Sequence, residues 1–193
     1  MKSRILILLA FIVVFGTFSV SAQPDSSFSK VTYFNSIHVG GLLGKKGNGS
    51  SLTASLIQGV RYKNFSFGIG IGYDAYRDWR TLPLFGSVSY DFARIRNNAF
   101  FIQLNAGLSK VWNPLEDDDQ FVLDDKAGRF IHPLVGYRIQ SQKFSLYMTA
   151  GYKLQHLAYE HRLRWLTWGY AANKVTIEQD IERLSVQLGF GFR

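Results

Sequence analysis

Apolar and polar residues alternate with a period of two through most of the chain after its first 22 residues. The clearest case is the last segment, where Leu184, Val186, Leu188, Phe190 and Phe192 alternate with Ser185, Gln187, Gly189 and Gly191. A period of two is typical of a strand whose two faces meet different surroundings. The pattern predicts eight strands, over 33–43, 52–62, 65–74, 84–92, 102–109, 131–139, 144–155 and 184–192.

The segments between these strands alternate in length. Short polar turns are expected at 63–64, 96–98 and 141–143, and longer connectors at 44–51, 77–81, 113–130 and 159–174. Membrane barrels have short periplasmic turns and longer outer loops in strict alternation. An even number of strands also predicts that both termini lie in the periplasm.

The polar face of the strands distinguishes a barrel from a soluble sandwich. A sandwich directs long charged side chains toward water, whereas this second face consists mostly of Gly, Ser, Thr, Asn and Gln. Small residues suit the crowded lumen of a narrow barrel, and the aromatic-rich apolar face suits lipid. We therefore predict an all-β fold, a closed antiparallel eight-stranded transmembrane up-and-down β-barrel.

The first 22 residues have the pattern of a secretory signal peptide. Lys2 and Arg4 precede the apolar stretch 5–15, and the small residues Val20-Ser21-Ala22 provide a cleavage site. We expect a signal peptide over 1–22 and an outer-membrane β-barrel domain over 23–193, in the outer membrane of a Gram-negative bacterium.

Composition excludes several other classes of protein. The chain has no cysteine, so it has neither a disulfide framework nor an acceptor for a lipoprotein anchor. Hydrophobic residues make up 47% of the sequence, but after the signal no apolar run approaches the roughly 20 residues of a spanning helix. The net charge of +8 is scattered, so nucleic acid is not an expected partner.

Several motifs resemble those of a known group of proteins. The stretch 76–85 with Tyr90-Asp91-Phe92 resembles the third-to-fourth-strand passage of small outer-membrane β-barrel domain proteins common in Bacteroidota. Gly136-Tyr137-Arg138, Ala150-Gly151-Tyr152-Lys153 and the ending 188–192 are also similar to strands of that family. The resemblance implies a location and an eight-stranded architecture like that of OmpA and OmpX, and it implies no activity.

The end of the chain bears on assembly. Barrel proteins frequently end in an aromatic residue that the outer-membrane assembly machinery reads, and here Arg193 follows Phe192. The resemblance implies that this machinery is a partner during insertion.

Strand parity places a set of charged residues inside the predicted lumen. They are Arg61, Asp74, Asp91, Arg138, Lys153 and Arg183, with His38 and His132 on the same side. Charges in a narrow lumen must pair or meet trapped water, because an unpaired buried ion is very costly. We predict a structural network that fills the lumen, with Arg61, Asp91 and Arg138 close together near the periplasmic end. A narrow channel for small solutes or ions is the alternative, since intramembrane charges often mark function.

Two outer loops are candidates for interaction. The first is acidic and contains Glu116, Asp117, Asp118, Asp119, Asp124 and Asp125. Its carboxylates suit Ca²⁺, but the spacing of a calcium-binding loop is missing, so a hydrated acidic loop is the expectation. The second mixes cations with aromatic residues that favour membrane interfaces: Arg162, Arg164, Trp165, Trp168 and Tyr170. We expect it to anchor at the level of the lipid headgroups, and contact with lipopolysaccharide phosphates or a partner protein is the alternative.

A third group could support catalysis on lipid. His156, Glu160 and His161 lie near the top of the seventh strand, with His156 at lipid-facing parity. No serine stands beside them in a recognisable nucleophile-and-base arrangement. We therefore expect no enzyme, no cofactor and no metal, with a lipid-modifying enzyme as the alternative. The expected function is a structural or surface-interaction role, with outer-membrane lipid, lipopolysaccharide and an unidentified surface or periplasmic protein as partners.

Overall fold

The computed structural model describes residues 31–44, 49–76, 80–111, 121–163 and 175–192, with backbone only at 121–127, 158–163 and 175–177. Eight strands account for nearly all of them. They are β1 (Thr32–Leu43), β2 (Ser50–Tyr62), β3 (Phe65–Ala75), β4 (Arg80–Ile95), β5 (Asn98–Val111), β6 (Phe121–Gln140), β7 (Phe144–Leu163) and β8 (Val175–Phe192). No helix among these residues is long and apolar enough to cross a membrane.

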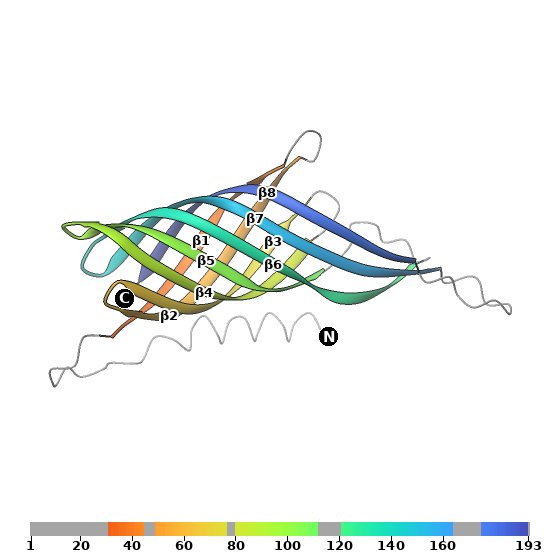
Figure 1. Cartoon of the computed structure of the whole chain (residues 1–193), viewed down its shortest axis with the longest axis horizontal. Coiled ribbons are helices and arrows are strands. Elements are labelled where there is room, and N and C mark those ends of the chain that lie inside the picture. Colours follow the sequence, from red (N-terminus) through yellow and green to blue (C-terminus); the bar gives the residue numbers. More distant parts are fainter. Residues whose placement is uncertain (1–30, 45–48, 77–79, 112–120, 164–174, 193) are drawn as a thin grey trace.

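The strands form one closed antiparallel barrel in chain order, with β1 paired to β8 (Figure 1). Each strand pairs with its sequence neighbours, so closure leaves no edge strand exposed. The predicted fold class and strand number are confirmed.

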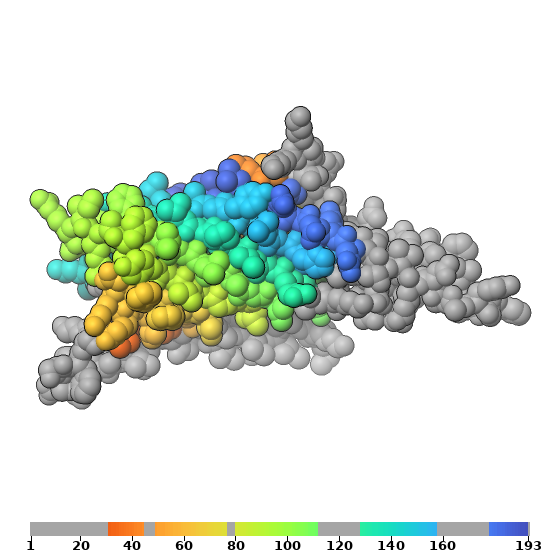
Figure 2. Space-filling view, in the orientation of Figure 1, coloured from red at the N-terminus to blue at the C-terminus, as the bar shows by residue number. Residues whose placement is uncertain are grey.

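Side-chain burial follows the predicted parity, with the apolar face outside. Ile69 and Leu188 are 71% and 64% exposed, whereas Asp74 and Ser109 are fully buried. Side chains of β4 to β8 cover the wall in adjacent diagonal bands (Figure 2). The molecule thus has an apolar outer wall and a polar interior, the reverse of a soluble protein.

The three last strands are longer than predicted. β6 begins at Phe121, β7 ends at Leu163 and β8 begins at Val175, so they extend past the other strands at one end (Figure 1). The predicted bounds of the connectors, 113–130 and 159–174, were therefore too wide. Pairing such as Asp124 with Glu160 continues the ladder where the sequence no longer alternates apolar with polar residues.

Inward-facing glycines make room for rings on the neighbouring strand. Gly70 is paired with Phe85, and Gly136 with Phe101. A Cβ atom at these glycines would lie 2.4 and 2.5 Å from the ring carbons. The small inner-face residues thus create space that aromatic side chains fill.

Candidate functional site

The lumen is the candidate site, because it holds the predicted charged residues. Arg61, Asp74, Asp91, Arg138 and Lys153 are all buried inside the barrel. Arg183 is half-buried, and its guanidinium lies 5.9 Å from the centre of the Tyr76 ring. Four of these residues form two centres: Asp74 pairs with Lys153, and Asp91 with Arg138.

The first centre crosses the barrel. Asp74 on β3 accepts hydrogen bonds from Thr53 Oγ1 at 2.7 Å and Thr81 Oγ1 at 3.1 Å. Lys153 on β7 donates to Asp74 Oδ2 and forms a buried ion pair with it. β3 and β7 lie on opposite sides of the eight-stranded ring, so this pair connects two walls of the barrel.

A neutral network extends from this centre. Gln155 Nε2 donates to Ser109 Oγ at 2.8 Å, and Gln155 Oε1 accepts from the Tyr76 hydroxyl at 2.7 Å. The Lys153 ammonium also lies 4.9 Å from the centre of the Phe130 ring. Polar bonds therefore join β3, β5 and β7 across the lumen at this level.

The second centre lies near the end with short turns. Arg138 Nη2 donates to Asp91 Oδ2 at 2.6 Å, and both side chains are almost fully buried. Arg94 Nη2 contacts the same oxygen at 3.0 Å from a position that is 45% exposed. The carboxylate thus has one buried and one exposed arginine partner.

Arg61 lies beside this centre but bonds elsewhere. Its Nε donates to Ser66 Oγ at 3.1 Å and its Nη1 to Gln140 Oε1 at 3.3 Å. The structure therefore places Arg61 near Arg138 and gives it neutral partners.

The two lumen histidines are buried. The ring of His38 is hydrogen-bonded to Ser36 Oγ at 3.1 Å and packs 5.2 Å from the Tyr147 ring. The Nε2 atom of His132 has no hydrogen-bond partner among the described residues. Within that part of the chain, no cluster of three or more His, Cys, Asp or Glu side chains is placed to hold a metal ion.

Aromatic rings close the space between the two centres. Phe85 and Phe130 meet edge to face at 5.7 Å, and Phe101 and Tyr147 meet at 6.1 Å. A cavity beside Phe101 and Tyr147 has a volume of only about 20 Å³, enough for about one water molecule. Among the described residues, side chains leave only this small cavity at the level of these rings.

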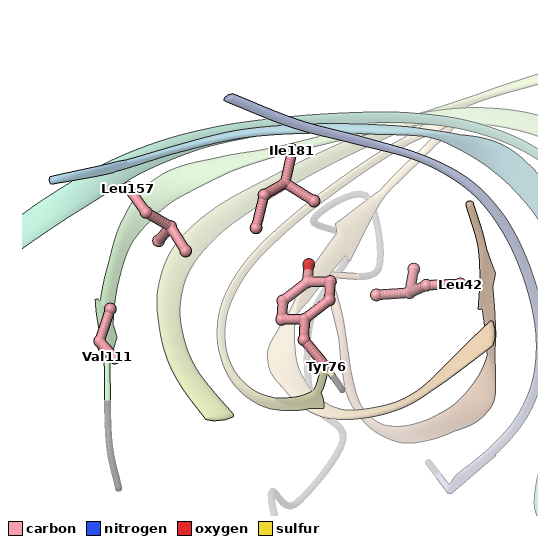
Figure 3. Close-up of a cluster of buried hydrophobic side chains, with 5 residues drawn as sticks. All are labelled: Leu42, Tyr76, Val111, Leu157 and Ile181. Carbon is pink, nitrogen blue, oxygen red and sulfur yellow. The ribbon is translucent and has the colours of Figure 1, made fainter. Parts of the chain in front are cut away.

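An apolar cluster lies toward the end with long connectors. It consists of Leu42, Tyr76, Val111, Leu157 and Ile181, all at most 6% exposed. Their side chains point inward from the surrounding strands (Figure 3). This cluster adds a hydrophobic layer inside the barrel beyond the Asp74 centre.

The outer wall carries a polar group near the same end. His156 Nδ1 lies 2.7 Å from Asp180 Oδ1, and the Tyr152 hydroxyl donates to Glu182 Oε2 at 2.6 Å. His156, Asp180 and Glu182 help to line an open groove of about 430 Å³ on β6, β7 and β8. Among the residues that the structure describes, no serine, threonine or cysteine lines this groove.

The candidate loop residues are placed only in part. Asp124 and Asp125 belong to β6 and Arg162 to β7, so the assignment of these three to loops was wrong, because the strands continue beyond the apolar wall. The expected signal peptide and the other candidate loop residues lie outside the described residues; the latter are Glu116, Asp117, Asp118, Asp119, Arg164, Trp165, Trp168 and Tyr170. The side chains of Glu160 and His161 also lie outside them.

No protein-family model and no curated protein matches the sequence. The crystal structure of Neisserial surface protein A matches with a TM-score of 0.53 at 12% identity, over 84% of this chain and 98% of that chain. The fold is that of a small outer-membrane barrel. The outer membrane protein AlkL, solved by solid-state NMR in lipid bilayers, matches with a TM-score of 0.47 at 14% identity, over 90% of this chain and 95% of that one.

Several lumen residues of this barrel were not predicted as site residues. Phe85, Phe101, Phe130 and Tyr147 fall at polar-face parity, and that parity is the signal that could have identified them as inward rings. Arg94 was missed for another reason: a β-bulge between Asp91 and Ala93 changes the parity of the residues that follow.

Proposed function

We propose that this protein is an integral outer-membrane barrel whose role is structural or interactive and whose lumen does not conduct. Its exposed apolar wall supports insertion in lipid, because an apolar face of this extent is unfavourable in water. Export through the expected signal peptide and a closed ladder without edges are consistent with an outer membrane.

The observation that carries the proposal is the filled lumen. The Asp74–Lys153 pair, the aromatic rings and the apolar cluster of Figure 3 occupy successive levels between the two ends. An eight-stranded barrel has an interior just wide enough for side chains to fill. Interaction would therefore take place on the outer wall and the connectors.

The lengths of the connectors support one orientation in the membrane. We propose that the short turns at Lys63-Asn64 and Arg96-Asn97 face the periplasm together with both termini, as in other barrels of this kind. The strand ends of β6, β7 and β8 would then extend above the outer surface and carry the acidic and the aromatic-basic segments.

The polar group on the outer wall supports contact with lipid headgroups. On the outer wall, His156 of β7 is paired with Arg129 of β6 and with Asp180 of β8. These three residues lie directly beyond the paired apolar positions Ile131 and Leu154. We assign them to the boundary where lipopolysaccharide phosphates would meet the wall. A lipid-modifying enzyme is the alternative for the His156–Asp180 pair, and mass spectrometry of lipid A after expression distinguishes the two, since contact alone leaves its acyl chains and phosphates unchanged.

Two measurements test the proposal. The purified protein should migrate faster on a detergent gel before boiling than after it, because a closed barrel resists detergent unfolding. It should also give no steady single-channel current in planar bilayers. Steady currents that disappear in an Asp91→Ala variant would overturn the filled lumen and support a narrow channel instead.

A further inference from the structure

The end of the barrel with short turns contains an open pocket of about 260 Å³. We call it the mouth pocket. Five of its ten lining residues are cationic: Arg61, Lys63, Arg94, Arg96 and Arg138. Asp91, just beneath it, offsets one of these charges. A strong excess of positive charge therefore surrounds a small space.

The cations are arranged in two levels. Arg61 and Arg138 are 7% and 3% exposed and form the base, whereas Lys63, Arg94 and Arg96 are exposed around the rim. Like charges in a confined space repel one another, and the repulsion is strongest where burial reduces screening. An anion between the two levels would relieve it.

Arg138 at the base of the mouth pocket has free hydrogen-bonding capacity. Arg138 gives one Nη2 bond to Asp91, and its buried Nε has no partner among the described residues. A buried donor without a partner is costly, and a guanidinium has five donors in a fixed planar arrangement. The base of the mouth pocket thus contains a guanidinium whose hydrogen-bonding capacity is only partly used.

The rim has an independent feature in its backbone. Lys63 and Arg96 have φ angles of 53° and 54°, in the left-handed region. Glycine and asparagine adopt this conformation with less strain than lysine or arginine. Both turns therefore place a cation at a position where the backbone alone would favour a different residue.

From these observations we propose that the mouth pocket binds a phosphate-bearing anion at the short-turn end of the barrel. Phosphate matches the site better than a single carboxylate, because its charge of about −1.5 to −2 and its several acceptor oxygens suit paired guanidinium groups. The same phosphate chemistry is available from a soluble ion or from a lipid headgroup in the adjoining leaflet.

The test uses the protein in phosphatidylcholine nanodiscs and titrates inorganic pyrophosphate at constant ionic strength, followed by calorimetry. Wild type should show saturable binding at one site. A Lys63→Gly/Arg96→Gly variant should lose affinity by about tenfold for each cation removed. Glycine relieves the backbone strain at both turns, so weaker binding would not come from a damaged fold, and faster migration of the unboiled protein on a gel checks this.

Two further variants separate charge from structure. Lys63→Asn/Arg96→Asn also accepts the left-handed backbone and should weaken binding to the same extent. Lys143→Gln removes an exposed cation from the third short turn, outside the mouth pocket, and should bind pyrophosphate as wild type does. Two results would overturn the proposal. In the first, wild type shows no saturable pyrophosphate binding in phosphatidylcholine and no response to phosphatidic acid. In the second, Lys143→Gln loses as much affinity as the variants of Lys63 and Arg96.

A lipid arm identifies the source of the phosphate. Nanodiscs with phosphatidic acid present a phosphate monoester, and nanodiscs with phosphatidylglycerol at matched net charge do not. The lipid headgroup is the ligand if phosphatidic acid suppresses pyrophosphate binding and phosphatidylglycerol does not. It is also the ligand if phosphatidic acid, but not phosphatidylglycerol, raises the thermal stability of wild type over that of Lys63→Gly/Arg96→Gly. If pyrophosphate binds equally in both, the ligand is a soluble phosphate.

Discussion

Asp91 and Arg94 lie three residues apart on β4, yet Arg94 Nη2 is 3.0 Å from Asp91 Oδ2. Residues three apart on a regular strand point to opposite faces. The bulge between Asp91 and Ala93 adds one residue, so Arg94 is paired with the buried Ala99 and shares the inner face with Asp91. The bulge thus adds a second arginine to a centre that Arg138 already occupies.

The two arginine partners of Asp91 should differ in their contribution to stability. Arg138→Met leaves a buried carboxylate without its buried partner and should lower the free energy of unfolding by about 3 kcal/mol. Arg94→Met removes an exposed partner and should cost less than about 1 kcal/mol. Urea unfolding of the barrel in lipid vesicles measures both. Equal losses of unfolding free energy in the two variants would show that burial does not set the contribution of each arginine.

The Asp74–Lys153 pair should act as a unit. Asp74→Asn and Lys153→Met each leave a buried group without its charge partner, and each should cost about 3–5 kcal/mol of unfolding free energy. The double variant should cost about 1 to 3 kcal/mol less than the sum of the two single variants. Additive losses in urea unfolding would show that the two side chains do not stabilise each other.

Glycines opposite the lumen rings should tolerate no side chain. Gly136→Ala places a Cβ atom 2.5 Å from Phe101 Cζ and should destabilise the barrel by about 1–3 kcal/mol. Gly86→Ala is the matched control, because its nearest atom would be 4.0 Å away, and its effect should stay within about 0.5 kcal/mol. A loss at Gly86 as large as that at Gly136 would argue against steric conflict with the ring.

The strand pattern and the inner-face parity could be predicted from the sequence, because lipid requires an apolar residue at every second position of a spanning strand. That requirement ends where a strand leaves the apolar wall. For this reason the extensions of β6 and β7, with Asp124 and Arg162, could not be recognised as strands.

The residues of the candidate site were predictable to different degrees. Parity alone identified Asp74 and Lys153 as inward, but not that they meet across the lumen, since that depends on barrel closure and strand stagger. Arg94 was hidden by the bulge, which inserts one residue without a marker such as glycine. The mouth pocket combines this bulge with two turns distant in sequence, so its charge could not be anticipated from any single segment.

The outer wall provides the last prediction. Ile69 lies at the centre of β3 and is 71% exposed, so in a membrane its side chain would contact the hydrocarbon core. Ile69→Arg should therefore lower the free energy of unfolding from lipid vesicles by about 2–4 kcal/mol, the cost of an arginine at the bilayer midplane. Glu178→Arg is the control, because Glu178 is exposed on β8 beyond the apolar positions and should tolerate arginine within about 1 kcal/mol. Equal tolerance at both positions would mean that the apolar wall does not face lipid, because only hydrocarbon makes arginine more costly at Ile69 than at Glu178.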